Sequence, residues 1–266
     1  MTTIHNARSA ESLPADTRAM IDKAHADGVE TVWDRLAAQE PQCGYCVLGV
    51  SCRNCVMGPC RIDPYGVGPT KGVCGADADV IVARNLGRTI VAGASAHSDH
   101  GRDILEAFEA VAHGEASGYR ITDEDKLRRL AGEFGLETDN RDINDIAVEV
   151  ADLLFGDFGS QRSQVTFVDR VPKPRTDKWR ELDVVPRGID RENVEMMHRT
   201  HMGVDNDYVN ILLHGIRTSL SDGWGGSMVA TELSDVLFGT PAPVTSTVNL
   251  GVLKADHVNV AMHGHN

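Results

Sequence analysis

Apolar residues recur every three to four positions along most of this chain, and polar residues fill the positions between them. This spacing is typical of amphipathic helices. It predicts helices over the ranges 11–38, 77–113, 122–134, 142–156, 189–199, 205–222 and 228–238. In the second of these, Asp77 is placed to cap the N-terminus, while Gly93 and Gly101 weaken the middle and predict a kink or a break. The prolines within 171–188 predict a linker there.

The pattern changes near the C-terminal end, where β-rich runs replace the helical spacing. After Pro241 and Pro243 the runs 244–254 and 258–262 are typical of strands, and the second leads directly into His263-Gly264-His265-Asn266. Polar side chains at the C-terminal end of a strand are how open α/β sheets build their sites. A lone strand is not stable without neighbours, so we expect the rest of this sheet to lie outside the sequence.

Together these patterns predict a mainly α protein in four parts. A helical segment spans residues 1–40, a loop rich in cysteine and glycine spans 41–76, and a helical domain spans 77–239. The start of a truncated α/β domain follows over 240–266.

Composition narrows the class of protein without identifying a partner. Of the 266 residues, 41% are hydrophobic and 24% are charged, which is ordinary for a soluble globular protein. The net charge of −13 disfavours nucleic-acid binding, which requires a basic surface. No run approaches the roughly 20 apolar residues of a membrane span, and the N-terminus lacks the apolar core of a secretory signal. We therefore expect a cytoplasmic protein.

All six cysteines lie between positions 43 and 74. A disulfide framework normally staples a small secreted domain along its whole length, so this clustering favours metal ligation. Four of the thiols have the spacing Cys52-x2-Cys55-x4-Cys60-x13-Cys74. Four thiolates satisfy either a tetrahedral zinc ion or a 4Fe-4S cluster. The spacing favours iron–sulfur, because zinc would leave two thiols idle, but it does not exclude zinc.

Two further features belong to the same loop. Gly58, Gly72 and Gly75 carry no side chain, so we expect their N–H groups to approach cluster sulfides closely. The remaining thiols, Cys43 and Cys46, fill only half of a four-thiolate site. The same pair from a second chain completes the site if a twofold axis passes nearby. Otherwise the two thiols form a separate redox pair or ligate one metal together with the other cysteines.

Several short sequence motifs resemble those of the nickel-containing anaerobic carbon monoxide dehydrogenases. The resemblance extends over nearly the whole chain from about Trp33, and the motifs occur in the same order as in that family, which makes the resemblance highly specific. The motifs are CRNCVMGPCRIDP (52–64), GVCGAD (72–77), IVAR (81–84), AHSDHGR (96–102), RTHMG (199–203), TELSDVLFGTP (231–241) and NLGVL (249–253).

The resemblance implies a homodimer in which Cys52, Cys55, Cys60 and Cys74 hold a 4Fe-4S cluster that relays electrons. It also implies that Cys43 and Cys46 contribute to a cluster bridging the two subunits. The close spacing of this pair resembles the family variant with a 2Fe-2S bridging cluster. In many relatives the spacing is wider and the bridging cluster is 4Fe-4S. The helical part would then lead into a Rossmann-like domain, and the external electron acceptor would be ferredoxin-like.

The family's active site is a Ni-Fe-S cluster that oxidises CO with water to CO2, two protons and two electrons. His265 matches the histidine that ligates its unique iron, and His263 matches a variable neighbouring position. The cysteines that hold this cluster lie further along in family members. Because this sequence has no cysteine after Cys74, we expect that the chain alone does not assemble the catalytic cluster.

His97 and His100 stand three residues apart on a predicted helix, so they face the same side. Taken alone, they are ordinary residues of a helix face. The resemblance instead implies a proton relay, for which histidine suits because its pKa lies near neutrality. The next two positions at three-residue steps on this helix face, which would extend such a ladder of proton-binding groups, hold Asp103 and Glu106. The other histidines, His198, His201 and His214, are expected to be structural.

Three other functions fit parts of this pattern. The chain could be a stand-alone iron–sulfur electron-transfer protein that has lost catalysis. It could be a relative of the hybrid-cluster proteins that reduce hydroxylamine, although their cysteines are spaced differently. A non-enzymatic zinc module is the third alternative.

Overall fold

The computed structural model describes residues 13–161 and 164–242, and this part of the chain is mainly helical. The chain divides into two compact units, residues 1–51 and residues 52–266. The predicted strands at 244–254 and 258–262, the Rossmann-like domain and His265 lie outside the described residues. Among the helices that the structure describes, none is both long and apolar enough to cross a membrane.

The first unit contains the helices α2 (Ala15–Ala26), α3 (Val32–Ala37) and α4 (Gly44–Val47). The single helix predicted over 11–38 is therefore wrong, because the chain turns at Gly28, which has φ +72°. Thr31 then starts α3 with a capping box: its N–H donates to Asp34 Oδ2 over 2.7 Å, and the Asp34 N–H donates to Thr31 Oγ1 over 3.4 Å. This local signal ends one helix and starts the next.

The second unit is built from long helices. Two short strands, β1 (Ser51–Cys52) and β2 (Cys60–Arg61), pair at the start of the cysteine-rich loop. The elements that follow are α5 (Ala78–Ala112), α6 (Glu124–Glu133), α7 (Ile143–Gly159), η2 (Thr166–Arg170), α8 (Lys173–Glu181), α9 (Ile189–Arg199), α10 (Tyr208–Ser221), the π-helical turn η3 (Asp222–Gly226) and α11 (Ser227–Phe238).

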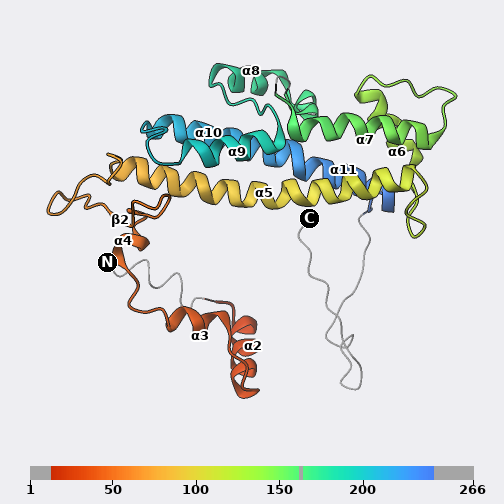
Figure 1. The fold of residues 1–266 in the computed structure, drawn as a ribbon. Helices are drawn as coiled ribbons and strands as arrows, with labels where there is room; N and C mark the ends of the chain where they lie inside the picture. Colours follow the sequence, from red (N-terminus) through yellow and green to blue (C-terminus); the bar gives the residue numbers. More distant parts are fainter. Residues whose placement is uncertain (1–12, 162–163, 243–266) are drawn as a thin grey trace. The chain divides into compact units, whose positions relative to one another are not determined.

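Helix α5 is the axis of this unit, and α7, α9, α10 and α11 pack along it (Figure 1). Its apolar stripe buries against these neighbours because the buried positions recur every three to four residues. The hydrophobic core is contributed mainly by α5, α6, α7, η2 and α11. Its fully buried members include Leu105, Phe108, Leu127, Leu130, Ile146, Val150, Leu154, Phe167, Val229 and Leu233.

The predicted break in α5 is wrong, because the helix runs unbroken through Gly93 and Gly101. Gly101 serves a different purpose, the close approach of a neighbouring backbone. A Cβ atom at Gly101 would lie 2.7 Å from the carbonyl oxygen of Gly226, and one at Gly226 would lie 2.6 Å from that of His97. The continuous helical segment formed by α10, η3 and α11 runs parallel to α5. Gly215 lies against Ile90, and eleven residues further along both segments Gly226 lies against Gly101.

Replacing Gly101 with alanine should destabilise the fold by about 1–3 kcal/mol, because the added methyl group forces two packed backbones apart. Gly93→Ala is the matched control on the same helix, since a Cβ atom there meets nothing within 4 Å. It should be neutral or stabilising by up to about 1 kcal/mol, since alanine is the better helix former. Urea unfolding of both variants measures the difference, and equal midpoints would contradict the close-approach explanation.

The linker predicted over 171–188 is also wrong in part, because α8 occupies its first half. Pro172 is the N-cap of α8 and Pro174 lies within the first two helical residues. Proline is well tolerated at this place because the N–H groups of the first turn have no partner within the helix. The remaining predicted helices agree with the structure to within a few residues at their ends.

Candidate metal centre

The four cysteines with cluster-like spacing line one pocket of the second unit. Cys52, Cys55, Cys60 and Cys74 are all partly buried there. The other lining residues come from the same loop, from α5 and from the turn after α9: Asn54, Gly58, Gly72, Val73, Ile81, Arg84 and Met202. The structure therefore gathers the four predicted ligands around one space.

Local backbone geometry brings these thiols together. Cys52 ends β1 and Cys60 begins β2, so the pairing of the two strands places them side by side. Gly58 allows a close approach of the backbone, because a Cβ atom there would lie 3.1 Å from the carbonyl oxygen of Cys52 and 3.2 Å from the nitrogen of Cys60. Cys74 lies in the turn before Asp77, which caps α5 by accepting from the Val80 N–H over 3.0 Å. The start of α5 thus fixes the fourth thiol.

The spacing of the sulfur atoms bears on the kind of metal. Within residues 13–161 and 164–242, no three cysteine sulfurs all lie within 4.8 Å of one another. A tetrahedral zinc ion with Zn–S bonds of about 2.3 Å would bring its sulfurs to within about 3.8 Å of one another. No three thiols of the described residues are therefore gathered as closely as the ligands of one zinc ion would be. A polynuclear cluster, whose ligands bind different metal atoms, does not require sulfurs that close.

Two of the pocket's cysteine sulfurs accept hydrogen bonds, and the donors are not the three glycines of the loop. The N–H groups of Gly58, Gly72 and Gly75 donate to backbone carbonyls, those of Cys55, Ala76 and Gly72 respectively. The expectation that these glycine N–H groups approach cluster sulfides stays a prediction. The Val73 N–H donates to Cys60 Sγ over 3.5 Å, and Arg84 Nη1 donates to Cys74 Sγ over 3.6 Å.

These donors change the chemistry of Cys74. Burial by itself would raise the pKa of its thiol, but the Ala76 N–H and the Arg84 guanidinium outweigh burial and lower the pKa below its ordinary value. The thiolate is the form of cysteine that ligates metals. The donor set and its surroundings therefore fit a metal group held by thiolates.

Cys43 and Cys46 belong to the first unit. Cys43 is the N-cap residue of α4 and Cys46 lies within that helix, so the two thiols are about one turn apart. Both side chains are exposed, and the Ser51 hydroxyl donates to Cys46 Sγ over 3.2 Å. Exposure is what a metal site completed by a second chain requires.

The two histidines of the predicted proton relay lie on α5. His97 is half-buried, and its Nδ1 lies 2.7 Å from Asp222 Oδ1 at the start of the π-helical turn η3. His100 is exposed, as are Asp103 and Glu106 further along the ladder. The relay remains a prediction.

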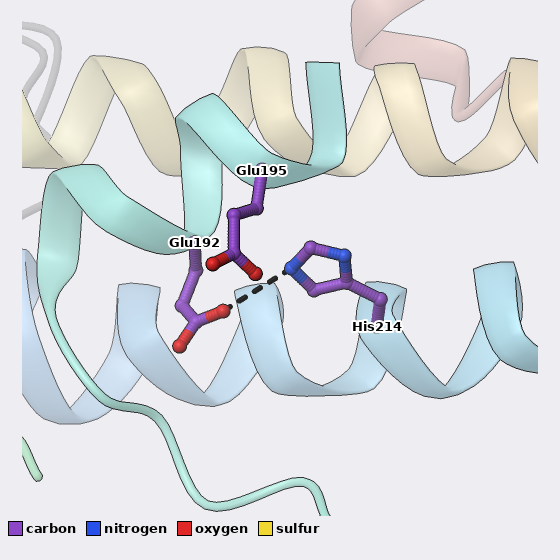
Figure 2. Close-up of side chains that lie close together, drawn as sticks. All are labelled: Glu192, Glu195 and His214. Carbon is purple, nitrogen blue, oxygen red and sulfur yellow. Dashed lines mark hydrogen bonds and ion pairs between the residues drawn. The ribbon is translucent and has the colours of Figure 1, made fainter. Parts of the chain in front are cut away.

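A separate cluster of titratable side chains joins α9 to α10. Figure 2 shows Glu192 and Glu195 of α9 pointing toward His214 of α10, and the ligand atoms of these three residues lie within 4.8 Å of one another. His214 Nε2 is 3.1 Å from Glu192 Oε2. Arg187 donates to Glu192 Oε1 and Oε2 over 2.9 and 2.7 Å, and it also binds Glu195.

Because Arg187 pairs with both carboxylates and Arg191 pairs with Glu195 at 3.2 Å, we interpret the cluster as an ion-pair network rather than a metal site. The structural role expected for His214 stays a prediction, and its bond to Glu192 is consistent with it. The sequence reading missed Glu192, although a signal was present: it occupies the buried face of α9 together with Ile189, Asn193 and Met196. A charged residue at a core position of an amphipathic helix needs a buried partner.

Comparison with known proteins gives consistent matches. The profile of the Prismane/CO dehydrogenase family matches residues 50–266. Carbon monoxide dehydrogenase 1 from Methanosarcina acetivorans is 57% identical over 255 residues, which are 96% of this chain and 41% of the relative. Carbon monoxide dehydrogenase 1 from Carboxydothermus hydrogenoformans is 52% identical over 242 residues, 90% of this chain and 38% of the relative.

Solved structures agree with the sequence matches. Ni-free carbon monoxide dehydrogenase from Thermococcus sp. AM4 superposes with a TM-score of 0.87 at 55% identity, covering 92% of this chain and 39% of that chain. An acetyl-CoA synthase/carbon monoxide dehydrogenase superposes with a TM-score of 0.84 at 40% identity, covering 90% and 36%. The chain spans about two fifths of the length of these relatives. Both the sequence and the helical fold show that this chain belongs to the Prismane/CO dehydrogenase family.

Proposed function

We propose that this chain is the electron-relaying portion of an anaerobic, nickel-dependent carbon monoxide dehydrogenase. The observation that carries the proposal is the pocket in which Cys52, Cys55, Cys60 and Cys74 meet. A 4Fe-4S cluster held there would pass electrons from the Ni-Fe-S centre, where CO and water become CO2, toward the bridging cluster and a ferredoxin-like acceptor. The relatives named carbon monoxide dehydrogenase support this function.

The residues of the pocket have two tasks in this proposal. The thiolates bind the iron atoms, and the absence of three closely gathered sulfurs among the described residues supports a cluster over a zinc ion. The Val73 N–H and Arg84 donate to two of the sulfurs and hold them in place. Hydrogen bonds to ligand sulfurs are one of the means by which proteins set the potential of such clusters.

We further propose that Cys43 and Cys46 share a 2Fe-2S or 4Fe-4S cluster with the same pair of a second chain, which makes the protein a homodimer. Their exposure on the first unit supports a shared site. We also propose roles for three histidines. His265 matches the residue that ligates the iron of the Ni-Fe-S centre in the family, and His97 and His100 would relay protons. The half-buried His97 at 2.7 Å from Asp222 offers one fixed proton-binding position on α5.

The experiment is a count of iron, nickel and acid-labile sulfide on anaerobically purified protein, together with its mass in solution. We expect a dimer with roughly ten irons, from two 4Fe-4S clusters and one shared 2Fe-2S cluster, and no nickel. Stoichiometric zinc, or a monomer without sulfide, would overturn the relay function. Stoichiometric nickel would instead show that this chain takes part in a complete catalytic centre.

A further inference from the structure

Arg84 is a cation buried against the cysteine pocket. It lies in the second turn of α5 and only 1% of its surface is exposed. Its Nη1 donates to Cys74 Sγ over 3.6 Å. Its Nη2 donates to the carbonyl oxygen of Asp205 over 2.7 Å and to Asn206 Oδ1 over 2.8 Å. The guanidinium thus connects a candidate ligand to the segment between α9 and α10.

No carboxylate balances this charge in the part of the chain that the structure describes. The acceptors of Arg84 are a sulfur, a peptide carbonyl and a side-chain amide. The carboxylate of Asp205 is turned to Arg199 instead, at 3.2 Å. Arg84 Nε is buried without a hydrogen-bond partner among the described residues. Burying a guanidinium without a counter-charge is costly, so the arrangement calls for an anion in the pocket.

A metal cluster held by four thiolates is such an anion. Its negative charge grows when it gains an electron, because the ligands and sulfides outweigh the charge of the irons. A fixed cation nearby therefore stabilises the reduced form more than the oxidised form. The effect is strong at a buried site because water does not screen it.

We propose that Arg84 is the charge-compensating and positioning residue of the four-cysteine cluster and raises its reduction potential. Asn206 holds the guanidinium in place through the 2.8 Å bond to Nη2. This inference rests on the proposed 4Fe-4S cluster, and it assigns the setting of the potential to one side chain. Lysine keeps the charge but lacks the fork that bonds the sulfur and the 205–206 segment together.

The test is an EPR-monitored redox titration of the anaerobically purified full chain. The signal of the four-cysteine cluster is the one that a Cys43→Ser, Cys46→Ser variant retains. In Arg84→Gln the ratio of reduced to oxidised cluster at a fixed ambient potential should fall at least tenfold, which is about 59 mV for a one-electron couple. Arg84→Lys should recover part of this loss.

The matched control is Arg88→Gln, one turn further along α5. Arg88 is partly exposed, and its Nε donates to Thr200 Oγ1 over 3.1 Å rather than to a cysteine. The same loss of charge there should change the ratio less than threefold, because solvent screens it.

If Arg84→Gln does not retain iron, a second variant tests whether Arg84 raises the reduction potential of the cluster. Asn206→Asp preserves the hydrogen bond to Arg84 and adds a carboxylate that compensates its charge, so it too should lower the ratio at least tenfold. An unchanged ratio in iron-replete Asn206→Asp and Arg84→Gln would overturn the role of Arg84 while leaving the cluster assignment intact. A wild-type chain without iron and sulfide would instead overturn the proposed function itself.

Discussion

Cys60→Ser should remove roughly four irons per chain from anaerobically purified protein. The Cys60 thiol contacts the 72–73 segment on the other side of the pocket. It accepts a hydrogen bond from the Val73 N–H over 3.5 Å, and a Cβ atom on Gly72 would lie 3.5 Å from its sulfur. A serine hydroxyl is a shorter and harder ligand, so three thiols would be left to hold the cluster. Iron and acid-labile sulfide counts, with the visible absorption spectrum, measure the loss.

Cys46→Ser is the matched control for this prediction. It removes a thiol from the other group of cysteines, where the Ser51 hydroxyl donates to Cys46. Only the bridging cluster should be affected, with a loss of roughly one iron per chain if that cluster is a shared 2Fe-2S. A Cys60→Ser protein with the full iron content would show that the pocket is not the cluster site.

Glu192→Ala should lower the free energy of unfolding by about 3–5 kcal/mol, because it leaves the Arg187 guanidinium and the His214 ring without their shared partner. Glu192 is 0% exposed and His214 is 2% exposed, so water cannot replace the bond that His214 loses. The partly exposed Arg187 is left paired with Glu195 alone. Urea unfolding monitored by circular dichroism measures the effect. Glu195→Ala is the control, since Glu195 is half-exposed on the same helix and should cost about 1 kcal/mol or less.

The same substitution should change how stability depends on pH. Burial alone would raise the pKa of Glu192, but the bonds from His214 and Arg187 outweigh it and lower the pKa from 4.5 to about 2. A carboxyl whose pKa is lower in the folded state stabilises the fold above its unfolded pKa, and that contribution disappears as the pH falls from about 4.5 toward 2. The wild type should lose stability through this window, and Glu192→Ala should lose less. Parallel pH profiles for the two proteins would contradict the role given to Glu192.

The sequence alone was sufficient where the determining interactions are local. Asp77, the N-cap predicted from the sequence, accepts a hydrogen bond from the backbone N–H three residues later. Asp123, Asp142 and Asp207 cap later helices by the same local interaction. The spacing of the four pocket cysteines is likewise a property of one short segment. The single helix over 11–38 and the linker over 171–188 are wrong for local reasons too. The capping box at Thr31 starts a second helix, and the prolines at 172 and 174 stand at the start of α8, where proline is tolerated.

The tertiary structure alone decided the features whose partners are distant in the chain. Gly101 lies on a helix that needs no glycine there, and only the backbone of Gly226 explains it. Arg84 resembles any other arginine of α5 until the 205–206 segment and Cys74 are seen around it. Glu192 similarly depends on His214 across two helices. Sequence patterns report which residues are buried, whereas the identity of a buried group's partner is set by the packing of elements, which periodicity does not encode.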